Sequence, residues 1–142
     1  MKRYIIILFA LLTIACDEED AILHNSYFHS ELEFLFQDPE GNNLLDPEVN
    51  ERFLHQEIEI HYIDEEGKKQ TASHTISYAR GYYTLQCEVN ADVCYLKLSE
   101  SIVDAIATAW LGGSDSNYMV KMWYNGELAW DREQEFPIVI TK

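Results

Sequence analysis

Three cysteines carry the most reactive side chains of this sequence: Cys16, Cys87 and Cys94. A thiol can become a nucleophile, a metal ligand or half of a disulfide, depending on its surroundings. Cys16 follows directly on an apolar run, whereas Cys87 and Cys94 stand in one later segment of alternating pattern. The two settings therefore predict different chemistry.

The segment that ends at Cys16 has the layout of an export signal. Lys2 and Arg3 precede an apolar run from Tyr4 to Ile14, which is too short to cross a bilayer, since a spanning helix needs about 20 residues. The stretch "LTIAC" resembles the bacterial lipoprotein signal, with Thr13 where leucine is usual. The resemblance implies cleavage before Cys16, a lipid on its sulfur, and an anchor in the outer membrane.

Four acids, Asp17 to Asp20, follow the cysteine. A run of like charges repels itself and stays solvated, so it predicts a tether between anchor and domain. In lipoproteins of Bacteroidetes-type bacteria, acids in this place often direct export to the cell surface; the alternative is an anchor that faces the periplasm. We expect a signal peptide at residues 1–15, an acidic tether at 16–27 and one domain at 28–142.

The charge balance excludes several partners. The chain has 25 acids and 10 bases, a formal net charge of −15, and two of the bases lie in the leader. Nucleic acids and anionic lipid headgroups need a positive surface, so neither is an expected partner.

Cys87 and Cys94 belong to the stretch "GYYTLQCEVNADVCYLKL", which predicts a hairpin centred on Asn90 and Ala91. With a loop of either two or four residues, Cys87 lies opposite Cys94. An exported protein meets an oxidising compartment, so we expect a disulfide between them. The alternative is a pair of buried thiols.

The aromatic residues late in the chain are the best candidates for ligand contacts. Asn125-Gly126 predicts a type I′ hairpin in "YMVKMWYNGELAW". Regular pairing then places Trp130 opposite Lys121, so that Trp123, Trp130 and Lys121 share one face. If that face is wet, it is a stacking platform for sugar rings or a protein groove. The alternative is that the tryptophans fill the core.

Motifs for catalysis are missing from the sequence. There is no Gly-x-Ser-x-Gly turn, no glycine-rich phosphate loop and no Cys-x-x-Cys pair. The histidines show no ligand spacing, and His74 is expected on an apolar face opposite Ile58. The sequence therefore predicts no metal, no cofactor and no enzymatic activity.

The elements that position these residues are strands. "ELEFLFQ" and "EIEIHYID" alternate with period two, and "QTASHTISY" is expected to pair back on the second of them. Turns are expected at "DPEG" and "DEEG", and a strand is favoured over a helix in "DAIATAWL". Some eight short strands predict a single antiparallel β-sandwich, while Pro47 to Phe53 allows one short helix.

The order of the leader, "FLFQDPEGNNLL" and "KMWYNGELAW" resembles that of small lipoproteins of Bacteroidetes-type bacteria. This resemblance implies an immunoglobulin-like or transthyretin-like sandwich and no catalytic residue. We therefore expect a lipid-anchored, non-catalytic binding or interaction module, held at the membrane by Cys16, with a protein or glycan partner. The alternatives are a structural subunit of a surface assembly and a glycan-active enzyme.

Overall fold

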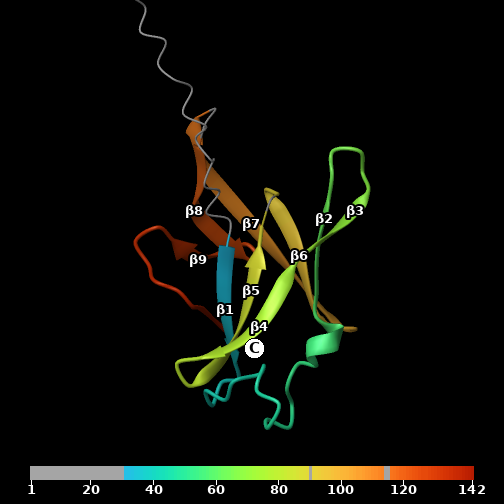
Figure 1. Cartoon of the computed structure of the whole chain (residues 1–142), viewed down its shortest axis with the longest axis vertical. Helices are drawn as coiled ribbons and strands as arrows, with labels where there is room; N and C mark the ends of the chain where they lie inside the picture. Colours follow the sequence, from blue (N-terminus) through green and yellow to red (C-terminus); the bar gives the residue numbers. More distant parts are fainter. Residues whose placement is uncertain (1–30, 90, 114–115) are drawn as a thin grey trace, which may run out of the picture.

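Two β-sheets face each other in the computed structural model, which describes residues 31–89, 91–113 and 116–142 (Figure 1). The predicted signal peptide, tether and Cys16 lie outside these residues. One sheet has the strand order β10-β1-β5-β4 and the other β3-β2-β6-β7-β8-β9. The predicted all-β sandwich is confirmed. The strands are β1 (Glu31–Gln37), β2 (Glu59–Ile63), β3 (Lys69–Ala72), β4 (His74–Ala79), β5 (Tyr82–Glu88), β6 (Val93–Ser99), β7 (Ile102–Gly113), β8 (Ser116–Tyr124), β9 (Glu127–Asp131) and β10 (Ile138–Thr141).

Apolar side chains at every second position of the strands fill the space between the sheets. Leu32, Phe34 and Phe36 of β1 are buried, and the residues between them are exposed or half-buried. The inner faces of both sheets supply the rest of one continuous core, because each strand presents every second residue to it. The first predicted strand is therefore confirmed residue by residue.

The strand β10 covers only part of β1. It pairs with β1 in parallel from Phe34 to Gln37, while β5 pairs with β1 on the other edge from Glu31 to Phe34. The cis bond before Pro137 leads into β10, at the start of an edge strand, where its missing N–H is tolerated. The first half of β1 has no partner from β10.

The predicted strand "QTASHTISY" is wrong as a single element. Its first half, β3, pairs with β2 in the expected register, Ile60 opposite Ala72, across the expected turn at Asp64 to Lys68. The chain then leaves the sheet at Ser73, and β4 joins the other sheet beside β5. His74 consequently faces Cys87 and not Ile58.

The predicted hairpin around Asn90 and Ala91 is also wrong. Cys87 on β5 and Cys94 on β6 belong to different sheets, so the chain crosses the sandwich between them. Both are buried, free thiols in the structure, and the expected Cys87–Cys94 bridge is not formed. Alternation identified the strands β5 and β6 correctly. The same pattern is expected, however, whether two strands pair within one sheet or face each other across the sandwich.

The segment between β1 and β2 crosses between the sheets. Its turn at Asp38 to Gly41 closes with a hydrogen bond from the Gly41 N–H to the Asp38 carbonyl, and Gly41 has a φ of +89°. The short helix allowed at Pro47 to Phe53 is not formed, because residues 47–51 form turns and a bend; a single 3₁₀ turn follows at His55–Glu57. Residues 102–113 form the strand β7, as expected.

A buried polar cluster joins the two sheets where β10 ends. The carboxylate of Asp104 on β7 accepts hydrogen bonds from the Tyr124 hydroxyl at 2.6 Å and from the Asn125 amide at 2.7 Å. It also pairs with the Lys142 ammonium at 2.5 Å, and that lysine directly follows β10. The opposing sheets are therefore tied together at this end.

Candidate binding cavity

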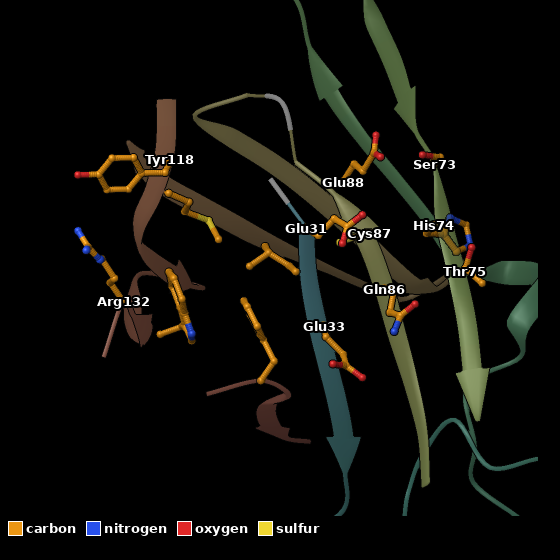
Figure 2. Close-up of a pocket in the computed structure, with 14 residues that line it drawn as sticks. Glu31, Glu33, Ser73, His74, Thr75, Gln86, Cys87, Glu88, Tyr118 and Arg132 are labelled. Carbon is orange, nitrogen blue, oxygen red and sulfur yellow. The ribbon is translucent and has the colours of Figure 1, made fainter. Parts of the chain in front are cut away.

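A cavity of about 870 Å³ opens beside the first half of β1 (Figure 2). Figure 2 shows Glu31, Cys87 and Glu88 together on the neighbouring strands β1 and β5, with Tyr118 and Arg132 across from them. The cavity borders the part of β1 that β10 does not pair with. Its lining residues are Glu31, Leu32, Glu33, Ser73, His74, Thr75, Gln86, Cys87, Glu88, Tyr118, Met119, Trp130, Arg132 and Phe136.

The buried lining residues are mostly apolar. Leu32, Met119 and Trp130 are buried, and the ring of Trp130 stacks on that of Phe136 with centroids 5.3 Å apart and planes 8° apart. The indole N–H of Trp130 donates to the Gln134 carbonyl at 3.1 Å, so its polar atom is already satisfied. The cavity thus offers a flat, apolar surface to a ligand.

Acidic residues stand at the ends of β1 and β5 that border the mouth of the cavity, on the face of the sheet opposite to that of Leu32 and Cys87. Glu31 lies directly opposite Glu88 in the antiparallel pair, and both are exposed. Like charges opposite each other on neighbouring strands are destabilising, so a cation bound beside Glu31 and Glu88 would be stabilising. Glu33 has partners of its own, since it accepts from the Thr84 hydroxyl at 2.9 Å and lies 3.7 Å from the Arg80 guanidinium.

The opposite wall carries one cation. The guanidinium of Arg132 lies 5.2 Å from the centroid of the Tyr118 ring, a cation–π contact that holds the charge at this wall. The side chain of Arg132 is exposed, whereas that of Tyr118 is half-buried. The mouth of the cavity therefore has a pair of carboxylates at the end of one sheet and a guanidinium across from them.

Two further lining residues could do acid–base or nucleophilic chemistry. Burial raises the pKa of the Cys87 thiol to about 12, with a smaller contribution from neighbouring Cys94, so the thiol is protonated at neutral pH and a poor nucleophile. Burial also lowers the pKa of the His74 imidazole, which favours the neutral ring. Both groups are suited to packing and hydrogen bonding in this setting.

The prediction that Trp123, Trp130 and Lys121 share one face, as a platform or as core, is wrong. A register shift between Met122 and Trp123 places Trp130 opposite Met122, and Lys121 opposite Asp131. Trp130 therefore points into the core and lines the cavity, while Trp123 stays on the outer face with Lys121. The hairpin itself is confirmed, with Tyr124 opposite Glu127 and positive φ angles at Asn125 and Gly126.

The sequence did not reveal the cavity, because its walls come from strands far apart in the chain. One sequence signal did exist: the buried face of β1 continues into Leu32, where an edge strand as short as β10 cannot reach. Among the described residues, no group of three or more histidines, cysteines and acids could hold a metal ion. No described helix is long and apolar enough to cross a membrane.

Comparisons with protein-family models, with curated proteins and with solved structures gave no match for this chain.

Proposed function

We propose that this protein is a lipid-anchored, non-catalytic binding module of the bacterial envelope, and that its ligand enters the cavity beside β1. The observation that carries the proposal is the combination of an apolar floor with the paired carboxylates Glu31 and Glu88 on the rim. Apolar clefts with a few oriented polar groups are the usual form of small-ligand sites.

The chemistry of the walls favours a ligand with an apolar body and a positive charge. The Trp130 and Phe136 rings contact the apolar part, and an ammonium beside Glu31 and Glu88 relieves their mutual repulsion. Amines and lysine-bearing peptides have this composition. The acidity of the whole chain, at −15, attracts such ligands from a distance.

Dansylcadaverine, which joins an aromatic group to a primary ammonium, is a suitable probe. We expect its fluorescence to rise saturably with the full chain, and dansylamide, which lacks the ammonium, to bind more weakly. Glu88→Gln should weaken the binding of dansylcadaverine by about 2–5-fold, as is typical of an exposed ion pair. Glu40→Gln, in the exposed turn at Asp38 to Gly41, is the matched control and should leave binding unchanged. Equal binding of both probes would contradict the role of the carboxylates.

The anchor needs a test of its own. Cells that express the protein would be fed an alkyne-tagged fatty acid, and the label on the wild type would be compared with that on Cys16→Ala. We expect the label to disappear in the variant and the protein to become soluble. Equal label on both would overturn the lipid anchor and leave the cavity unaffected.

A structural subunit of a surface assembly is the second candidate. The observation that favours it is Val139, which is 52 % exposed on β10, an edge strand of its sheet. Edge strands with exposed apolar side chains are common sites of association between chains. Val139→Lys would then reduce the apparent mass in size-exclusion chromatography to that of a monomer.

A further inference from the structure

The outer face of the six-stranded sheet carries a band of aromatic and small side chains. Cross-strand pairing puts Val93, Ala107, Trp123 and Leu128 in one row across β6, β7, β8 and β9. The adjacent row holds His61, Tyr95 and Ala105 across β2, β6 and β7. We call these seven residues the aromatic band. None of them lines the cavity described above.

The band has a shape suited to flat rings. Tyr95 and Trp123 stand on the two strands that flank β7, in adjacent rows, which places them about 12 Å apart at the backbone, since neighbouring strands are spaced by about 4.8 Å and adjacent rows by about 6.8 Å. The alanines of β7 between them leave a shallow floor. The ring of His61 stacks on that of Tyr95 with centroids 5.4 Å apart and planes 24° apart, which fixes the tyrosine in place.

Lysines border the band along the strands. Lys97 lies two residues beyond Tyr95 on β6, and Lys121 lies two residues before Trp123 on β8. The acids opposite these lysines have other partners: Glu59, opposite Lys97, pairs with Lys69 at 2.5 Å. Asp131, opposite Lys121, accepts a hydrogen bond from the Glu133 N–H at 3.1 Å. On a chain with a net charge of −15, this face therefore combines stacking surfaces with cations.

We propose that the aromatic band is a second binding surface and that its ligand is an acidic oligosaccharide. The C–H faces of sugar rings stack on the faces of Tyr95 and Trp123, whose quadrupoles are negative at the centre. Carboxylates on the sugar meet Lys97 and Lys121, which offset the repulsion by the acids elsewhere on the protein. Neutral sugars would gain the stacking contacts alone.

Tetragalacturonate is the probe, and its methyl ester, which is neutral, is the matched control ligand. Calorimetry with the full chain should show binding of the acid form and clearly weaker binding of the ester. Tyr95→Ala and Trp123→Ala should each weaken binding about 5–10-fold through loss of a stacked ring. Lys97→Gln and Lys121→Gln should weaken it about 2–5-fold and reduce its dependence on salt.

Two control variants lie away from the band. Tyr78→Ala removes an exposed tyrosine from β4 on the other sheet, and Lys68→Gln removes an exposed lysine from a turn. Both should bind like the wild type, and thermal melts should show that every variant is folded. The proposal is overturned if neither sugar binds, if acid and ester bind equally, or if Tyr78→Ala weakens binding as much as Tyr95→Ala. A loss of dansylcadaverine binding alone, through Glu88→Gln, leaves this surface intact.

Discussion

At the end of β1 that includes Phe36, the two sheets are in close contact, whereas at the end that includes Glu31 a cavity separates them. The first end has β10 paired along β1, a group of aromatic rings and the Asp104–Lys142 ion pair. The second end has no pairing from β10 and a cavity of about 870 Å³. The two ends share one strand and one alternation pattern.

The two ends of β1 differ because the edge strand β10 pairs with only one of them. The rings of Phe34 and Phe36 stack with centroids 5.8 Å apart. Both also contact the ring of Tyr124 on the opposite sheet, with centroid distances of 6.0 Å from Phe34 and 6.4 Å from Phe36. Leu32 belongs to the same buried face, yet it faces a cavity because β10 begins opposite Phe34. A sandwich can thus keep one end rigid and leave the other open for a ligand, with stability supplied away from the binding site.

The largest expected effect is at the closed end, from Asp104→Ala. The substitution leaves the Lys142 ammonium and the Tyr124 hydroxyl without their buried partner, and breaking one side of a buried ion pair costs about 3–5 kcal/mol. Urea denaturation should show this loss in the free energy of unfolding. Glu127→Ala, an exposed acid in the nearby hairpin, is the control and should change it by less than about 0.5 kcal/mol. Equal midpoints for the two variants would mean that this end is not held by the cluster.

The next prediction separates the two tryptophans. Trp130 is 7 % exposed and stacked on Phe136, so Trp130→Ala should cost about 3 kcal/mol or more. Trp123 is half-buried on the outer face, and Trp123→Ala should cost about 1 kcal/mol. Thermal melts compare the two directly. Small and equal shifts would place both rings on one wet surface and would restore the platform of Trp123 and Trp130.

Acid should weaken the closed end through Asp104. Burial on its own would raise the pKa of this carboxyl, but hydrogen bonds from Asn125, Lys142 and Tyr124 outweigh it and hold the pKa below 3.8, the ordinary value. A lowered pKa contributes stability that is complete above the unfolded pKa and is lost as the pH falls through the folded one. Asp104→Asn should therefore be less stable than the wild type at neutral pH, and the gap should narrow below about pH 4. A constant gap across an acid titration, followed by urea denaturation, would exclude this carboxylate as the source.

The sequence predicted the strands and turns well, but it predicted poorly which strands pair with one another. Alternation located β1 and β7, and the positive φ angles required at Asn125 and Gly126 marked the β8–β9 turn, because these features depend on neighbours along the chain. The break at Ser73 left no comparable signal, since β3 and β4 alternate in step across it. Which sheet a strand joins depends on packing over long sequence separations.

The candidate site shows the same limit more sharply. A single irregular step in the β8–β9 ladder moved Trp130 off the face that it was expected to share with Trp123 and onto the floor of the cavity, because side chains change face with each residue of shift. Cys87 and Cys94 are buried as their pattern requires, but on opposite sheets. The burial of both cysteines could be predicted from the sequence, whereas their neighbours across the sandwich could not.

The smallest expected effect concerns the open end, and it has the opposite sign. Glu88→Gln removes one charge from the Glu31–Glu88 pair, so the free protein should become more stable by about 0.2–1 kcal/mol. The same change should weaken dansylcadaverine binding, because the ammonium loses a partner. Residues kept for function often cost stability in this way, whereas residues kept for structure do not. Urea denaturation and fluorescence titration of the one variant measure both quantities. A variant that is less stable and binds normally would make Glu88 a structural residue and would move the ligand's charge contact away from this rim.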